Sequence, residues 1–371
     1  MTKKVLCIIG TRPEVIKMAP VIRALRAAPE LEVNVLASGQ HREMLVPLID
    51  WFELGIDADL RVMTENQSLS VLTARLMQAF EQQFATSRPD LVLAQGDTTT
   101  VMCAALSCFY LNIPFGHVEA GLRTFDVRNP FPEEFNRVAV TRLAQLHFCP
   151  TERSRANVLA EHINAATVHL TGNTVIDALQ FTIGKLDTQP ARNFDHDILL
   201  TAHRRENLGA PLADICGALI DLCREFPKLK VLYPVHPNPN VRITVQRLLA
   251  GQPQITLADP LPYPDLVAAM QRAKLILTDS GGIQEEAPAL AKPVLVLRAV
   301  TERPEAVELG AAKVIGTARA VIVSETRRLL LDTDHYARMA RGGSPYGDGH
   351  TANRIRDVVC RYLHATHDAT P

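Results

Sequence analysis

Short apolar runs alternate with longer segments of helical periodicity along almost the whole chain. Strands that alternate with helices in this way are typical of βαβ units and parallel sheets. The runs predict six strands in each half, at 5–9, 33–37, 91–94, 114–118, 146–149 and 168–170, and at 197–201, 230–235, 255–258, 274–278, 293–297 and 313–315. The pattern therefore predicts an α/β protein with two doubly wound parallel-sheet domains.

A polar, proline-containing stretch follows the first six strands and marks the expected domain boundary. We assign residues 1–172 to a first domain, 173–350 to a second, and 351–371 to a C-terminal helix that packs back on the first. A chain of 371 residues is long enough for each of two domains to bury its own core.

Composition and charge exclude several classes of protein. With 47% hydrophobic and 21% charged residues, the chain is expected to be soluble and globular rather than disordered or fibrous. A net charge of −1 without a basic arm excludes nucleic acid as a partner. No apolar run is long enough for a signal peptide or a membrane span, which predicts a cytoplasmic protein without a membrane partner. The seven cysteines include no CxxC pair and are expected to be reduced core residues.

Polar and ionisable residues follow most of the predicted strands. In open parallel sheets, ligands bind beyond the carboxyl ends of the strands. Six strand ends carry such residues together, which is more than unrelated surface loops would supply. They are Arg12, Asp97, Glu119, His203, His236 and the run Ser280-Gly281-Gly282.

The segment LTDSGGIQEEA, residues 277–287, predicts a strand end followed by a helix start. Small residues at a helix start leave backbone N–H groups free to meet an anion, and Glu285 and Glu286 follow within two turns. The expected ligand therefore offers both phosphates and hydroxyls. The simpler alternative is that Ser280 only caps the helix. Arg12 and Lys17 could reach such an anion, although Lys17 could equally lie on a solvated helix face.

Three carboxylates of the first half are candidates for proton transfer. Asp97, Glu119 and Glu133 lie at or just after predicted strand ends, with Arg123 and Arg137 close by in sequence. In an enclosed site, burial and neighbouring charges tune such groups toward general acid or base work. Glu134 is instead expected to be an exposed residue of a helix start, where an acidic side chain suits the helix dipole.

Common cofactor and metal motifs do not fit. GDGHTA at 347–352 matches the GxGxxA fingerprint, but no strand precedes it and too little chain follows to form a βαβ unit. A Walker loop, an HExxH motif and a Cys/His cluster at ligand spacing do not occur either. The sequence therefore predicts no NAD, no other cofactor and no metal.

Eleven segments, taken in order, resemble the non-hydrolysing UDP-N-acetylglucosamine 2-epimerases of bacteria. The resemblance runs from Val5 to about Arg356. The segments are GTRPEVIKMAPVI, GQHREML, GDTTT, GHVEAGLRT, PEEFNR, TGNTVIDAL, HRREN, YPVHPNPNV, TDSGGIQEEAPALAKPVLVLR, TERPEAV and PYGDG.

This resemblance implies a fold, a reaction and partners. It implies the GT-B-like fold, with two Rossmann-like domains, a cleft between them and a returning C-terminal helix. The implied reaction interconverts UDP-N-acetylglucosamine and UDP-N-acetylmannosamine for surface polysaccharides, without a redox cofactor. UDP leaves by anti elimination to give 2-acetamidoglucal and then adds back. The family also suggests a homodimer and activation by a second UDP-N-acetylglucosamine.

The resemblance also implies roles for individual residues. Ser280, Gly281 and Gly282 would hold the diphosphate, Glu286 the ribose hydroxyls, and Leu261 and Leu266 would lie by the uracil. The catalytic set would be Asp97, Glu119, Glu133 and His203, with the carboxylate for each face of the sugar left open. Further substrate contacts would come from Arg12, Lys17, Arg137 and Arg303. The activator site would use Gln40, His41, Arg204 and His236.

Two positions depart from the family pattern. Many relatives carry His where Gln95 stands and an aromatic residue where Leu266 stands. The first departure affects a local hydrogen bond, and the second affects packing on the base.

Four alternative functions can be compared with the residues present. An epimerase of a UDP-diacetamido-uronic acid tends to show GARPQ where this chain has GTRPE, so Thr11 and Glu14 favour the simpler sugar. Hydrolysing relatives are often fused to a kinase, which this sequence does not contain. A GT-B glycosyltransferase would need an acceptor pocket and fewer carboxylates. A catalytically silent sensor would have lost the carboxylates.

Overall fold

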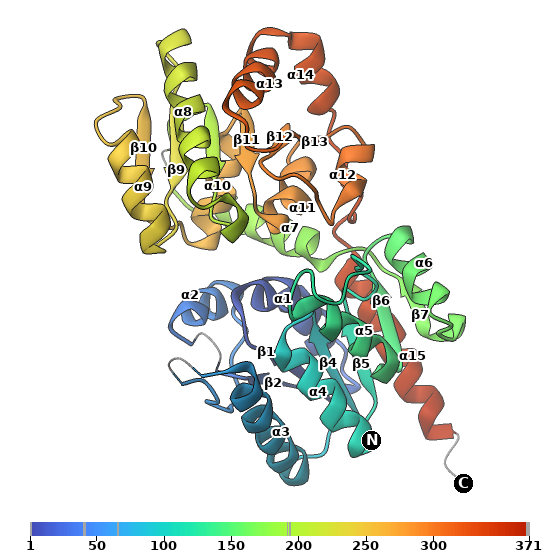
Figure 1. Cartoon of the computed structure of the whole chain (residues 1–371). Coiled ribbons are helices and arrows are strands. Elements are labelled where there is room, and N and C mark those ends of the chain that lie inside the picture. Colours follow the sequence, from blue (N-terminus) through green and yellow to red (C-terminus); the bar gives the residue numbers. More distant parts are fainter. Residues whose placement is uncertain (1, 40–41, 65–66, 191, 193, 369–371) are drawn as a thin grey trace. The chain divides into compact units, whose positions relative to one another are not determined.

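The computed structural model describes residues 2–39, 42–64, 67–190, 192 and 194–368. Contacts divide the chain into two compact units (Figure 1). Unit 1 comprises Met1–Ala178 and Tyr346–Pro371, and unit 2 comprises Leu179–Pro345. These divisions lie a few residues from the expected boundaries at 172 and 350.

Unit 1 is built on a parallel sheet whose strands are β1 (Lys3–Ile9), β2 (Leu31–Ala37), β3 (Ala58–Asp59), β4 (Leu91–Gln95), β5 (Phe115–Val118), β6 (Leu146–Cys149) and β7 (Val168–Leu170). Their order in the sheet is β3-β2-β1-β4-β5-β6-β7, and each pair is parallel. The six predicted strands of this half are confirmed. Strand β3 was not predicted, because two residues are too short to leave a hydrophobic pattern.

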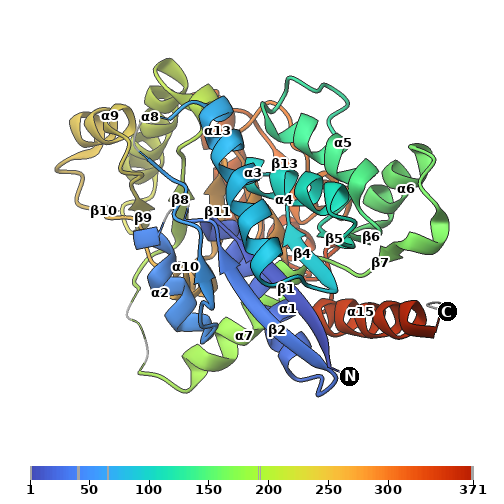
Figure 2. The ribbon, with the colours of Figure 1, turned by 90° about the horizontal axis from the view of Figure 1, so that it is seen from below.

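The helices of unit 1 are α1 (Arg12–Arg26), α2 (Arg42–Phe52), α3 (Leu69–Thr86), α4 (Thr99–Tyr110), α5 (Glu133–Leu143), α6 (Glu152–Ala160) and α15 (Thr351–Asp368), and α7 (Thr174–Asp187) leads into unit 2. Helix α15 packs against α1 (Figure 2). The backbone N–H of Ala352 donates to Asp177 Oδ1 at 2.8 Å, which ties the start of α15 to the start of α7.

Unit 2 repeats the same design with strands β8 (Ile198–Thr201), β9 (Val231–Pro234), β10 (Ile255–Ala258), β11 (Leu275–Thr278), β12 (Val294–Val296) and β13 (Ala312–Val314). Their parallel order is β10-β9-β8-β11-β12-β13, so all six predicted strands are confirmed. The helices are α8 (Ala210–Glu225), α9 (Pro239–Leu249), α10 (Tyr263–Arg272), α11 (Gly281–Ala289), α12 (Pro304–Glu308), α13 (Arg319–Leu331) and α14 (Thr333–Met339).

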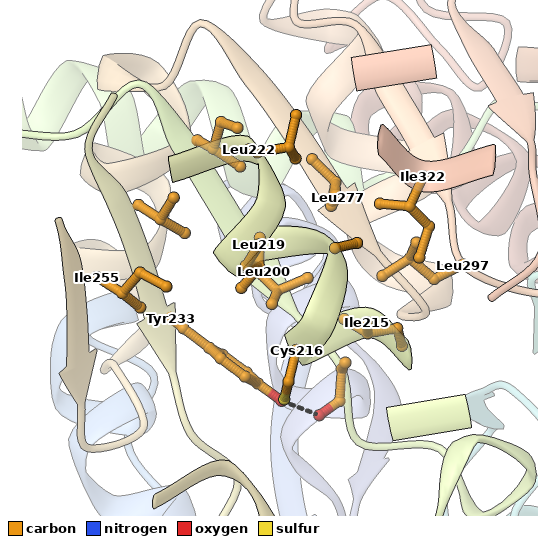
Figure 3. Close-up of a cluster of buried hydrophobic side chains, with 14 of the residues drawn as sticks. Leu200, Ile215, Cys216, Leu219, Leu222, Tyr233, Ile255, Leu277, Leu297 and Ile322 are labelled. Carbon is orange, nitrogen blue, oxygen red and sulfur yellow. Dashed lines mark hydrogen bonds between the residues drawn. The ribbon is translucent and has the colours of Figure 1, made fainter. Parts of the chain in front are cut away.

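The core of unit 2 lies between the sheet and helices α8, α9 and α13. Leu200 and Leu277 from adjacent strands face Leu219 of α8, and all three side chains are fully buried (Figure 3). Strands covered by helices on both faces have continuous apolar runs in their sequence, which is why they could be predicted. The buried Tyr233 satisfies its hydroxyl by donating to the Ala202 carbonyl at 3.0 Å.

The order of each sheet reverses beside its first strand. In unit 1 the reversal lies between β1 and β4, and in unit 2 between β8 and β11. Doubly wound sheets bind ligands at this switch point, beyond the carboxyl ends of the two strands. The residues after β1, β4, β8 and β11 are therefore the first places to look for a site.

Two further predictions can be compared with the structure. The seven cysteines are free and six of them are buried, which confirms them as reduced residues that lie mostly in the core. None of the helices in the described part of the chain combines the length and the apolar character that crossing a bilayer takes.

Candidate active site

The turn after β1 is held in place by hydrogen bonds to a buried carboxylate. Glu14 is 2% exposed, and its Oε2 accepts the backbone N–H groups of Gly10 and Thr11 at 2.6 and 2.9 Å. Thr98, after β4, donates its hydroxyl to the other carboxylate oxygen at 2.7 Å. Gly10 has no room for a side chain, since a Cβ there would lie 2.3 Å from Ser38 Oγ. Arg12, half-buried at the first position of α1, is thereby placed at the switch point.

Glu119, after β5, is held by three donors from three different segments. Lys17 of α1 forms an ion pair with its Oε1, and both side chains are 7% exposed. Asn173 donates to the same oxygen at 2.8 Å, and Gln95 donates to Oε2. The Glu119 backbone has a φ of +68°, a left-handed conformation that costs a non-glycine residue roughly 1–3 kcal/mol. Lys17 is therefore not on a solvated helix face, and Gln95 supplies a hydrogen bond of its own.

Asp97 and Arg137 form a second charged group in unit 1. Arg137 Nε and Nη2 lie 2.9 and 2.7 Å from Asp97 Oδ2, and Asn136 donates to the Asp97 carbonyl at 2.8 Å. The Asp97 side chain is 27% exposed, so the carboxylate stays open to a ligand while its position is set by α5. Arg137 is close to the candidate carboxylates in sequence, and in the structure it contacts Asp97.

The expectation for Glu134 is wrong. Glu134 is fully buried, accepts the backbone N–H groups of Thr124 and Phe125 at 2.9 and 3.0 Å, and pairs with Arg137 at 2.9 Å. It fastens the loop before α5 to that helix. The helix dipole gives no information about this loop, so the burial of Glu134 could not be predicted from it. Its neighbour Glu133 is half-exposed, and its carboxylate has no hydrogen bond or ion pair with any residue that the structure describes.

In unit 2, the Ser280-Gly281-Gly282 turn forms the N-terminus of α11, as expected. Ser280 is the N-cap residue but its side chain makes no capping hydrogen bond. Arg303 lies over this helix end, since a Cβ on Gly281 would be 2.7 Å from the guanidinium carbon. Glu285, 1% exposed, holds Arg303 through an Nε–Oε1 contact of 2.6 Å. Glycine and a fixed cation together make the helix end suited to an anion.

Glu286 is 5% exposed and accepts a hydrogen bond of 2.8 Å from the Tyr263 hydroxyl. A carboxylate fixed beside a helix N-terminus can accept hydrogen bonds from ligand hydroxyls while the helix end binds an anion. Leu261 and Leu266, the residues implied for the base, flank Tyr263 and are half-buried.

His203, after β8, lies against Asp279, the residue after β11. The two side chains approach to 3.2 Å between Nδ1 and Oδ1. The ring of His236 stacks on His203, with the centroids 5.3 Å apart and the planes 11° from parallel. Burial lowers the pKa of His203 most, His236 and Arg204 lower it further, and Asp279 opposes them. His203 is therefore neutral near pH 7.

The structure gathers most of the expected residues at the two switch points. Of the four positions expected at an activator site, Arg204 and His236 lie beside His203, whereas Gln40 and His41 lie outside the described residues. Asn173 and Asp279 had no predicted role. Asp279 stands inside the TDSGG motif and directly after a strand, so the rule used for the other strand ends could have found it.

Potential metal ligands do not cluster in the described part of the chain. There, no group of three or more His, Cys, Asp or Glu side chains is arranged to hold an ion. His117 and His147 are core residues whose ring nitrogens contact backbone carbonyl oxygens. Burial lowers the pKa of His117 to about 3, so this ring is neutral.

Comparison with known proteins gives the family. The family model described as UDP-N-acetylglucosamine 2-epimerase matches residues 23–360. The chain belongs to the UDP-N-acetylglucosamine 2-epimerase family. It is 46% identical over 368 residues to the UDP-N-acetylglucosamine 2-epimerase of Escherichia coli K12, covering 96% of this chain and 98% of the relative.

Solved structures of this family share the fold. The UDP-GlcNAc 2-epimerase of Neisseria meningitidis, bound to UDP-GlcNAc, matches with a TM-score of 0.92 at 43% identity, over 96% of this chain and all of that one. Staphylococcus aureus MnaA in complex with UDP matches with a TM-score of 0.89 at 42% identity, over 98% and 97%. A glycosyltransferase of kitacinnamycin, 11% identical, has a TM-score of 0.65 and shows a similar fold only. The prediction of two parallel-sheet units of the GT-B-like type is confirmed.

Proposed function

We propose that this protein interconverts UDP-N-acetylglucosamine and UDP-N-acetylmannosamine without a cofactor. Asp97, held by Arg137 after β4, and Glu119, held by Lys17 after β5, carry the proposal, because a transferase of the same fold would need an acceptor pocket and fewer carboxylates. The solved relatives bound to UDP-GlcNAc and to UDP support the substrate class.

The residues of unit 2 would hold the nucleotide. The diphosphate would meet the backbone N–H groups at the start of α11 and the guanidinium of Arg303, which Glu285 keeps in place. Glu286, fixed by Tyr263, would accept the ribose hydroxyls, and Leu261 and Leu266 would pack on the uracil. Arg12 and His203 would add further contacts to the diphosphate.

The chemistry of the sugar requires that epimerisation begin with the elimination of UDP. The proton on the second carbon is only weakly acidic, since no carbonyl stands next to it. As the bond between the anomeric carbon and UDP breaks, UDP leaves with the electron pair and positive charge develops on the ring. A carboxylate then removes the proton on the opposite side, which gives 2-acetamidoglucal and UDP. Re-addition of UDP and delivery of a proton to the other face complete the epimerisation.

The residues of unit 1 suit these steps. Asp97, Glu119 and Glu133 are the candidates for moving the two protons. Glu119 is surrounded by donors, which supports a role in stabilising the positively charged ring, whereas the carboxylate of Glu133 is unengaged by the described residues and can exchange a proton without breaking an ion pair. Electrostatic stabilisation of the departing diphosphate is worth several kcal/mol in a closed site.

Proton NMR of the purified protein with UDP-N-acetylglucosamine in deuterated water tests the function. We expect UDP-N-acetylmannosamine with deuterium at the second carbon. Free UDP with free sugar would overturn the proposal in favour of hydrolysis. No change would overturn it in favour of the diacetamido-uronic acid substrate, or of transfer to an acceptor, which are tested next in the same tube.

Three wider features follow from the same proposal. The product would supply surface polysaccharide synthesis in the cytoplasm, where nucleotide sugars are made. A homodimer is expected, which light scattering of the purified protein would test. A second UDP-N-acetylglucosamine would activate the enzyme through Arg204 and His236, which predicts a sigmoidal rate curve that becomes hyperbolic in His236→Ala.

A further inference from the structure

Asp279 is a buried carboxylate that the reaction as described does not use. It is fully buried and lies between β11 and Ser280, the N-cap of α11. A carboxylate so placed costs several kcal/mol in desolvation unless its neighbours compensate. Its position one residue before the proposed diphosphate site suggests that it serves that site.

The two oxygens of Asp279 have different surroundings. Oδ2 accepts three N–H groups, from the backbone of His203 and Arg204, both at 2.8 Å, and from the side chain of Asn207 at 2.9 Å. This oxygen fastens the loop after β8 to the end of β11. Oδ1 makes no well-aligned hydrogen bond with the described residues, and His203 Nδ1 lies 3.2 Å from it.

An acceptor beside Nδ1 selects one tautomer of a neutral imidazole. The proton stays on Nδ1, where the carboxylate attracts it, and Nε2 carries the lone pair. In this tautomer Nε2 can accept a proton but cannot donate a hydrogen bond to a phosphate oxygen. The ring must therefore gain a proton before it can stabilise a diphosphate.

The charged and titratable groups around His203 favour that gain only when an anion is present. Asp279 lies on one side of the ring, His236 stacks on it, and Arg204 belongs to the same loop. Arg204 and His236 disfavour an imidazolium, and a bound diphosphate would reverse the balance by placing a second anion near the ring. The imidazolium would then lie between two negative groups.

We propose that Asp279 is a positioning residue which holds His203 in the Nδ1–H tautomer, so that Nε2 takes up a proton when a nucleoside diphosphate binds. The claim that His203 is the Nδ1–H tautomer rests on the geometry of unit 2 alone. The claim that Nε2 takes up a proton also rests on the proposed diphosphate site. In the epimerisation, the protonated His203 would stabilise UDP as it leaves and release the proton when UDP leaves the enzyme.

The tautomer is measured first, by ¹⁵N NMR of the full-length protein labelled at histidine, with His203→Asn to assign the signal. We expect the proton of His203 to lie on Nδ1 in the unliganded wild type. In Asp279→Asn the amide oxygen can still accept the three N–H groups, while the amide NH₂ faces Nδ1 and moves the proton to Nε2. A wild-type signal from the Nε2–H tautomer would overturn the proposal, even if the variant does not fold.

Proton uptake is measured by calorimetric titration with UDP at pH 7 in two buffers of different ionisation enthalpy. The wild type should take up more than half a proton per UDP, and Asp279→Asn and His203→Asn close to none, with at least about tenfold weaker binding in Asp279→Asn. Asp195→Asn, which removes an exposed carboxylate of unit 2 that pairs with Lys230, is the matched control and should retain the uptake. Equal uptake in the wild type and Asp279→Asn would refute the proposal. A wild type that binds no UDP would instead refute the nucleotide site.

Discussion

Glu14 should make unit 1 lose stability as the pH rises from 4.5 to about 7. Burial raises the pKa of its carboxyl from 4.5 to about 7, and hydrogen bonds from Thr98, Thr11 and Gly10 offset only part of that effect. Below pH 4.5 the group is protonated in both the folded and the unfolded chain. Between pH 4.5 and 7 the unfolded chain releases the proton while the folded chain keeps it. Stability is therefore lost over this interval, by about 3 kcal/mol at 1.36 kcal/mol per pKa unit.

Glu14→Gln isolates this effect. The amide oxygen can accept the two backbone N–H groups and the amide NH₂ can donate to Thr98, so the turn after β1 is kept without a titrating group. We expect the variant to match the wild type in free energy of unfolding near pH 4.5 and to exceed it by about 3 kcal/mol at pH 8.

Urea unfolding at pH 4.5, 6, 7 and 8 provides the measurement. Trp51 is the only tryptophan of the chain and belongs to α2, so its fluorescence reports on unit 1. Glu152→Gln, which removes an exposed carboxylate from α6 of the same unit, is the matched control and should change nothing beyond about 0.5 kcal/mol. If Glu14→Gln and the wild type show parallel pH dependences, the buried carboxyl does not keep its proton and the reasoning fails.

Three further substitutions have expected outcomes. Asp97→Asn should abolish turnover in the NMR assay yet leave UDP binding within about threefold in calorimetry, since the proposed nucleotide site lies in unit 2; normal turnover would remove Asp97 from the mechanism. Lys17→Met leaves Glu119 buried without its cation and should lower the free energy of unfolding in urea by about 2–4 kcal/mol. The double variant with Glu119→Gln should lose less stability than Lys17→Met alone, and losses that simply add would contradict this coupling. Glu286→Gln should weaken UDP binding by about tenfold but 2′,3′-dideoxy-UDP hardly at all; equal losses would exclude contact with the ribose.

The strands and their ends could be predicted because their signals are local. A strand buried on both faces needs a continuous apolar run, and the residue after it must be polar if the strand end meets a ligand. This logic located 91–94 followed by Asp97, and 274–278 followed by Ser280, without any knowledge of the sheet. The two-residue β3 gave no such signal and was missed.

Residues that act through distant partners could not be predicted in this way. Glu134 has the sequence context of an exposed helix start, yet it is buried by a loop that begins ten residues earlier. Asn173 reaches Glu119 across 54 residues of chain. In both cases the decisive neighbour comes from a separate element, and spacing along the chain carries no information about it.

The chain's alternating pattern was enough to specify two parallel-sheet units and the residues at their strand ends, because burial and turn chemistry act over a few neighbouring residues. Tertiary structure alone decided the strand order, and the order places β1 beside β4 and β8 beside β11. The same order places β5 beside β4, and together these neighbours bring His203 against Asp279 and Lys17 against Glu119. The physical reason is that a charge pair depends on the distance between two side chains in space, which only the packed sheet and helices establish.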